Sequence, residues 1–289
     1  MMPPAFEYMA PTDVDEAIDL LNRYGDDAKI LAGGQSLLPL LKSRITSIPY
    51  LISLSEVKDI SYITDGKNSL KIGAMTLDAD LEYSPTVRKN FPILSDALGQ
   101  LADPLVRNMG TVGGNLSHGD PSNDLPSVML ALDATFKIRG KSGEREVHSR
   151  DFYMDTFVTA LEHGEILTEI SVPYWPAASG GAYVKFRKGT WNFSVAGVAV
   201  QLQLDNEIVK KAGIAITSMG PTALKASEAE NYLKGKKLTA ENVRHAAELV
   251  VAASQPSSDS YGSVEYKKEI LRRISVQAIK KAQTRAEVK

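Results

Sequence analysis

Apolar residues recur along the chain at two spacings, which predict a mixture of helices and strands. Between Asp13 and Tyr24 they fall at helical spacing, with Thr12 or Asp13 as N-cap and Gly25 at the end, so an amphipathic surface helix is predicted there. Further helices are expected at Leu77–Tyr83, Ile93–Ala102 and Leu125–Leu132. Short apolar runs bounded by turn residues predict strands at Ala28–Ala32, Tyr50–Leu54, Ser69–Ala74, Ala134–Arg139 and Ile166–Val172.

The pattern changes at residues 173–181, where Pro, Gly and small residues combine. Beyond this stretch, strands are predicted at Ala182–Arg187, Ser194–Leu204 and Ile208–Ser218, and helices at Ala223–Leu233, Ala240–Ala253 and Val264–Ala282. The pattern therefore predicts an α+β protein with a domain boundary near residue 176. Its second domain, residues 177–289, is expected to be a three-stranded antiparallel sheet packed with helices.

Length and composition fit a globular protein of two compact units. The 289 residues exceed the usual size of one hydrophobic core, and 43% hydrophobic with 24% charged residues is ordinary for this class. No stretch approaches the roughly 20 apolar residues of a membrane helix. The net charge of −2, with Lys and Arg spread along the chain, offers no basic field for nucleic acid. Since Met1–Phe6 does not resemble a secretory signal, we expect a cytoplasmic protein.

The chain contains no cysteine, which narrows the chemistry that it can perform. Iron–sulfur clusters are held mainly by Cys thiolates, so this chain is not expected to carry one, and a thiol nucleophile is excluded. The G-x-S-x-G and H-E-x-x-H motifs of common hydrolases and metalloproteases are absent. Any redox chemistry would therefore use a bound organic cofactor or a partner chain.

The first candidate binding segment is Ala32–Ser36, a Gly-Gly turn between a predicted strand and a short Leu-rich helix. Paired glycines let backbone N–H groups approach a bound anion closely, so a pyrophosphate would fit. A plain connector is the alternative for such a turn. The spacings of a Rossmann fingerprint and of a P-loop are both missing.

The second candidate is Met109–Asp124, a segment dense in Gly, hydroxyl and amide groups. Many short donors suit a polyhydroxylated, phosphate-bearing ligand, although an irregular surface loop is the alternative. Asp124 could cap the helix that follows, contact a ligand, or both. Asp103 and Arg107 could pair with each other or with a phosphate. For His118 we expect a solvated or locally bonded histidine rather than a covalent anchor, metal ligand or acid–base group.

Taken together, the two segments resemble those of the FAD-binding medium subunits of the molybdenum hydroxylases, the carbon monoxide dehydrogenase and xanthine dehydrogenase family. The resemblance covers essentially the whole chain. It rests on Ala32–Ser36, Ala102–Asn115, Gly119–Pro121, Asp124–Pro126, Gly164–Ile170 and Lys185. Gln35 departs from the His of many carbon monoxide dehydrogenase-like members, and Trp191-Asn192-Phe193 stands where an acidic residue followed by an aromatic is common.

The resemblance implies a two-lobed FAD-binding domain of the PCMH/VAO type at residues 1–176, with lobes at about 1–56 and 57–176, before the C-terminal domain. It implies no catalytic acid or base and no metal ligand. Non-covalent FAD would be bound by Ala32, Gly33, Gly34, Gln35, Ser36, Ala102, Val106, Gly110, Thr111, Gly113, Gly114, Asn115, Asp124, Leu167 and Lys185. For Lys185, an exposed solvated lysine is the alternative.

The family also implies partners and a role. A large subunit would oxidise substrate at a molybdenum cofactor, a small subunit would carry two [2Fe–2S] clusters, and a dimer of such heterotrimers would form. This chain would take electrons from the clusters and pass them to an external acceptor. The alternatives are a free-standing FAD-dependent reductase or oxidase and a nucleotide-binding module without a redox role.

Overall fold

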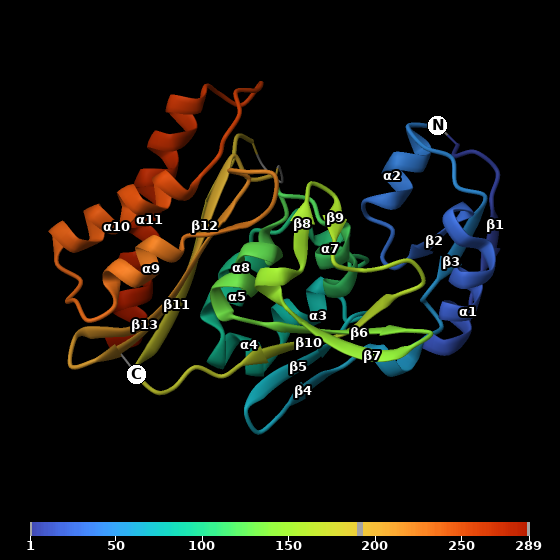
Figure 1. Ribbon diagram of the computed structural model, residues 1–289, viewed down its shortest axis with the longest axis horizontal. Coiled ribbons are helices and arrows are strands. Elements are labelled where there is room, and N and C mark those ends of the chain that lie inside the picture. Colours follow the sequence, from blue (N-terminus) through green and yellow to red (C-terminus); the bar gives the residue numbers. More distant parts are fainter. Residues whose placement is uncertain (1, 190–192, 288–289) are drawn as a thin grey trace.

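The computed structural model describes residues 2–189 and 193–287, in which the strands form four sheets (Figure 1). A three-stranded sheet near the N-terminus lies at one end of the molecule, a four-stranded sheet near the C-terminus at the other, and a five-stranded sheet between them. The fourth is a small hairpin of β8 (Tyr153–Asp155) and β9 (Val158–Thr159), which stands on the middle part.

The N-terminal lobe is a parallel sheet covered by one helix. Its elements are β1 (Glu7–Met9), α1 (Val14–Tyr24), β2 (Ala28–Leu31), α2 (Leu37–Lys42) and β3 (Tyr50–Ser53). The strand order is β1-β3-β2. Asp13 caps α1 by accepting the Glu16 N–H at 2.8 Å, and α1 ends at Gly25, as the sequence predicts. Because the strands are parallel, their C-terminal ends meet at one edge, where β2 leads into Ala32–Ser36.

The middle lobe is an antiparallel sheet in the order β4-β5-β10-β6-β7, with helices packed on one face. Its strands are β4 (Ile63–Asp65), β5 (Ser69–Gly73), β6 (Thr135–Gly140), β7 (Gly143–His148) and β10 (Ile166–Pro173). Its helices are α3 (Asp78–Tyr83), α4 (Pro85–Asn90), α5 (Pro92–Leu98), α6 (Pro104–Arg107), α7 (Val112–His118) and α8 (Asp124–Leu132). Buried side chains of the sheet, such as Ile72 and Phe136, form a core with those of α5 and α8.

The C-terminal part is an antiparallel sheet in the order β11-β12-β13-β14. Its elements are β11 (Ser179–Phe186), β12 (Ala196–Asp205), β13 (Ile208–Thr217), β14 (Leu224–Lys225), α9 (Ser227–Leu233), α10 (Ala240–Ala253) and α11 (Val264–Glu287). The three helices share a core with large residues of the sheet, whereas α5 and α8 of the middle lobe pack on its other face (Figure 1). That second face carries small residues, including Ala199, Gly213 and Ala215, which let α8 approach closely.

Three predictions about elements were wrong in detail. The segment Met109–Asp124, in which no helix was predicted, contains helix α7. The helix expected to reach Ala102 ends at Leu98, and the remaining residues form a turn. The C-terminal sheet gains a fourth strand, the two-residue β14, in a stretch expected to be helical.

Candidate functional site

The two glycine segments lie against each other. A Cβ atom on Gly33 would collide with the backbone oxygen of Met109 and stand 2.8 Å from the Cα atom of Gly110. A Cβ atom on Gly114 would stand 3.3 Å from that of Ala32. The structure therefore brings together Ala32–Ser36 and Gly110–Asn115, which are about eighty residues apart in sequence. Glycine at position 33 is required by this backbone contact, independently of any ligand.

The first segment presents unpaired donors. The backbone N–H groups of Gly33, Gly34, Gln35 and Ser36 donate no hydrogen bond to any residue that the structure describes. Gly34 has φ +72°, and the Gln35 side chain holds the turn by donating to the Gly33 carbonyl at 2.9 Å. Successive N–H groups in such a turn form a concave site for an anion, and they stand at the C-terminal edge of a parallel sheet.

The second segment, Gly110–Asn115, offers an unpaired acceptor instead of unpaired donors. The N–H groups of Val112, Gly113 and Gly114 donate to Thr76 O at 3.0 Å, Ala74 O at 2.8 Å and Thr111 Oγ1 at 3.1 Å. The start of α7 is thereby fixed to the edge of the middle sheet, and its donors are already used. Asn115 Oδ1 is buried and has no hydrogen-bond partner among the described residues. A ligand would complete this group.

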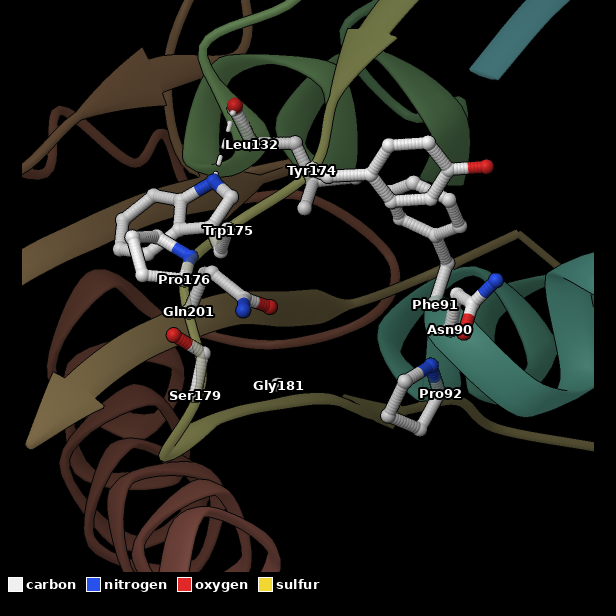
Figure 2. Close-up of a pocket in the computed structure, with 10 residues that line it drawn as sticks. All are labelled: Asn90, Phe91, Pro92, Leu132, Tyr174, Trp175, Pro176, Ser179, Gly181 and Gln201. Atoms are coloured by element: carbon white, nitrogen blue, oxygen red, sulfur yellow. Dashed lines mark hydrogen bonds between the residues drawn. The ribbon is translucent and has the colours of Figure 1, made fainter. Parts of the chain in front are cut away.

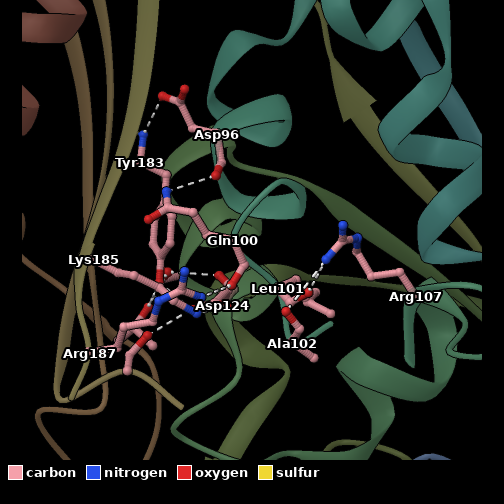
Figure 3. Close-up of polar contacts among 12 residues, drawn as sticks. Asp96, Gln100, Leu101, Ala102, Arg107, Asp124, Tyr183, Lys185 and Arg187 are labelled. Carbon is pink, nitrogen blue, oxygen red and sulfur yellow. Dashed lines mark hydrogen bonds and ion pairs between the residues drawn. The ribbon is translucent and has the colours of Figure 1, made fainter. Parts of the chain in front are cut away.

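Asp124 and Lys185 form a buried ion pair between the middle lobe and the C-terminal part (Figure 3). Lys185 Nζ lies 2.7 Å from Asp124 Oδ2, and the two side chains are 1% and 5% exposed. The other oxygen, Oδ1, accepts from Tyr183 OH at 2.6 Å and from Ser194 Oγ at 2.8 Å. The alternative of a solvated Lys185 is wrong, because β11 directs this side chain inward.

The structure answers two questions about capping and pairing near α8 and α6 that the sequence leaves open. Asn123, not Asp124, occupies the N-cap position of α8. Asp103 caps α6 by accepting the Val106 N–H at 2.9 Å and does not pair with Arg107, whose Nε donates to Glu82 Oε2 at 2.8 Å instead.

The environment of Arg107 includes one perturbed acid, Asp78. Burial raises the pKa of the Asp78 carboxyl to about 7, and the positive charge of Arg107 opposes this only in part. Asp78 lies under the second segment, because its N–H donates to Gly110 O at 2.9 Å. No sequence motif marks Asp78, or the Tyr183 and Ser194 side chains that bind Asp124.

The other predicted residues occupy diverse positions. Leu167 is buried in the core of the middle lobe, Val106 is half-buried on α6, and Ala102 lies in the turn before α6 with φ +41°. Phe193 is exposed, whereas Trp191 and Asn192 lie outside the described residues.

His118 ends helix α7, and its ring centroid lies 5.1 Å from that of Phe157. The ring is half-buried, and burial lowers its pKa. No group of three or more metal-ligating side chains occurs in the part of the chain that the structure describes.

A small pocket of about 80 Å³ opens at the junction of the middle and C-terminal parts (Figure 2). The rings of Phe91 and Tyr174, 5.2 Å apart, line one side, and Gln201 extends into it from the C-terminal sheet. Trp175 Nε1 donates to Leu132 O at 3.3 Å and fixes the chain where it crosses between the two parts. None of the predicted binding residues lines this pocket.

Two family models match the chain. The model described as the FAD binding domain in molybdopterin dehydrogenase matches residues 4–175, and the model described as the CO dehydrogenase flavoprotein C-terminal domain matches residues 181–282. The described residues include no helix with the length and apolar composition needed to cross a membrane.

Similar proteins match over nearly the whole chain. The carbon monoxide dehydrogenase medium chain of Hydrogenophaga pseudoflava is 40% identical over 267 residues, which cover 92% of this chain and 93% of that protein. The 6-hydroxypseudooxynicotine dehydrogenase complex subunit alpha of Paenarthrobacter nicotinovorans is 36% identical and covers 99% and 97%. A solved structure of the Hydrogenophaga pseudoflava carbon monoxide dehydrogenase, lacking the Mo-pyranopterin moiety of its molybdenum cofactor, has a chain with a TM-score of 0.97, 40% identity and 99% coverage of both chains.

Proposed function

The chain belongs to the FAD-binding medium subunits of the carbon monoxide dehydrogenase and xanthine dehydrogenase type of molybdenum hydroxylase, and we propose that the paired glycine segments hold its FAD. The observation that carries this site assignment is the row of unpaired N–H groups at Gly33–Ser36. A diphosphate supplies the anionic acceptors that such a row lacks. The unpartnered Asn115 Oδ1 suits the hydroxyl groups of a ribityl or ribose unit.

Bound FAD would exchange electrons one at a time or in pairs, so it can connect single-electron carriers to a two-electron acceptor. The chain's own residues bind and orient the cofactor and perform no acid–base step. Because the chain has no cysteine, the iron–sulfur clusters that deliver electrons belong to another subunit. We assign the partners as a large molybdenum-cofactor subunit and a small [2Fe–2S] subunit.

The Asp124–Lys185 pair would keep the C-terminal part closed against the middle lobe beside the cofactor. The pair is fully enclosed, and Tyr183 and Ser194 saturate the remaining oxygen of the carboxylate. Ion pairs that are saturated in this way favour one arrangement of the groups around them, since any displacement leaves a buried charge uncompensated. In this proposal residues 1–176 form the FAD-binding domain, residues 177–289 the second domain, and the complex is a cytoplasmic dimer of heterotrimers.

The proposal is tested by purifying the full chain, incubating it with FAD and removing the excess. We expect a flavin absorption spectrum at one FAD per chain, and heat should release the flavin because the attachment is non-covalent. Chromatography then identifies it as FAD. A chain that remains colourless after this treatment, while circular dichroism shows it folded, would refute the proposal.

A further inference from the structure

The turn between α5 and α6, residues 99–103, contains a strained residue. Ala102 has φ +41°, in the left-handed region of backbone conformation that residues other than glycine rarely adopt. Such a conformation persists only where surrounding contacts impose it. The preceding residues of the turn are ordinary, with Leu101 N donating to Leu98 O at 3.2 Å.

Arg107 contacts this turn from the protein interior (Figure 3). Its NH1 group donates to Leu101 O at 2.8 Å and lies 3.5 Å from Ala102 O, so two successive carbonyls face one guanidinium. Its Nε donates to Glu82 at 2.8 Å, and the Arg107 side chain is only 8% exposed. The planar guanidinium group is thus bound to the turn through NH1 and to Glu82 through Nε, and it holds the turn from the protein interior.

The other side of the turn carries unused donors. The N–H groups of Ala102 and Asp103 make no hydrogen bond to any described residue, and both residues are only half-buried. With the carbonyls of Leu101 and Ala102 engaged by Arg107, these two N–H groups remain available to an acceptor from outside the protein.

Arg107 also connects this turn to the paired glycine segments. It is the last residue of α6, whose N-cap is Asp103. The chain then continues into Met109 and Gly110, which touch Gly33. One buried side chain therefore fixes the turn that precedes α6 relative to the segment that follows it.

We propose that Arg107 is a positioning residue for FAD: it holds Ala102 in the left-handed conformation, so that the N–H groups of Ala102 and Asp103 bind acceptor atoms of the cofactor. The inference rests on the proposed function, because the cofactor is the ligand of these donors. It assigns no direct contact between Arg107 and FAD.

The test is a mutant cycle on the full chain, read as the dissociation constant for FAD from quenching of flavin fluorescence and as the thermal unfolding midpoint without FAD. We expect Arg107→Lys to weaken FAD binding at least tenfold, because a single ammonium group cannot make the separate hydrogen bonds that the guanidinium NH1 and Nε donate. In the Arg107→Lys background, Ala102→Gly should tighten FAD binding at least threefold, since glycine adopts positive φ without support. The coupling is the difference between the effect of Ala102→Gly on FAD binding in the Arg107→Lys background and its effect in the parent chain.

Arg88→Lys is the matched control, because Arg88 donates to the Glu82 carbonyl at 3.0 Å but is exposed and does not contact the turn. It should bind FAD like the parent.

Equal effects of Ala102→Gly in the parent and in the Arg107→Lys background would overturn the inference, because a merely structural role of Arg107 predicts no coupling between the two positions. If Arg107→Lys does not fold, Ala102→Val decides the question: it should weaken FAD binding at least tenfold, and parent-like binding would overturn the inference. Failure of the parent chain to bind FAD would count against the proposed function instead.

Discussion

Replacing Ser36 by aspartate places a negative charge beside the row of unpaired N–H groups without disturbing the fold. Ser36 is exposed and occupies the N-cap position of α2, where its side chain makes no capping hydrogen bond to the described residues. Aspartate is well tolerated at N-caps and favourable near the positive end of a helix. Ser36→Asn is the matched control, because asparagine has nearly the same shape and no charge. Gly33→Val would be a poor probe, since its Cβ atom collides with Met109 whether or not a ligand is present.

The expected magnitude follows from the Coulomb energy. A carboxylate about 5 Å from one phosphate charge costs roughly 1–3 kcal/mol for an effective dielectric constant between 80 and 20. Since about 1.4 kcal/mol is a factor of ten, FAD binding should weaken about 5- to 150-fold. Ser36 is exposed, so added salt should screen part of the effect.

The assay is titration of FAD followed by quenching of its fluorescence, at low and at high salt, with thermal unfolding measured in parallel. Ser36→Asp should bind more weakly than Ser36→Asn at low salt, and the gap should narrow at high salt. Both variants should unfold at or above the midpoint of the parent chain. Equal affinities of the two variants at low salt would refute the reasoning, because the diphosphate would then lie elsewhere.

Three further predictions concern stability, measured by chemical denaturation. Burial raises the pKa of the Asp78 carboxyl from 3.8 to about 7. The stability that the protonated carboxyl contributes is therefore fully present below pH 4 and is lost as the pH rises to 7. In that window the free energy of unfolding should fall by up to about 1.4 kcal/mol per pH unit. Asp78→Asn should flatten this slope, and an unchanged slope would contradict the assignment. Lys185→Met should cost roughly 3–5 kcal/mol by leaving Asp124 unpaired, and adding Asp124→Asn should recover part of it; strictly additive losses would argue against the pairing. Gly33→Ala should cost about 1–3 kcal/mol without FAD, because the loop against Met109 must shift, and parent-like stability would contradict that contact.

Local signals predicted the main elements well. The capped, amphipathic helix α1 and the long strands of the C-terminal sheet follow directly from spacing and turn residues. Helix α7 was missed because Gly113 and Gly114 suggest a loop, although Thr111 is an ordinary N-cap residue. The glycines are needed there because α7 starts against the sheet, where a Cβ on Gly113 would stand 2.5 Å from that of Ala74.

The site was predictable only in outline. The two glycine segments stand out by composition, and their adjacency follows from the family resemblance. The partners of Asp124 are Tyr183 on β11 and Ser194 just before β12. Both lie more than fifty residues later in the sequence, so no local pattern identifies them. The same holds for Arg107, whose role depends on the path of the turn before α6 and not on its neighbours in sequence.

The most direct test of the account is an NMR titration of the isotope-labelled full chain with FAD, following the backbone amides of Gly33, Gly34, Gln35 and Ser36. We expect these amide signals to shift strongly and to become protected from exchange as one equivalent of FAD binds, because each would gain a phosphate acceptor. Full occupancy by FAD with these four signals unchanged would contradict the claim that the paired glycine segments hold the cofactor.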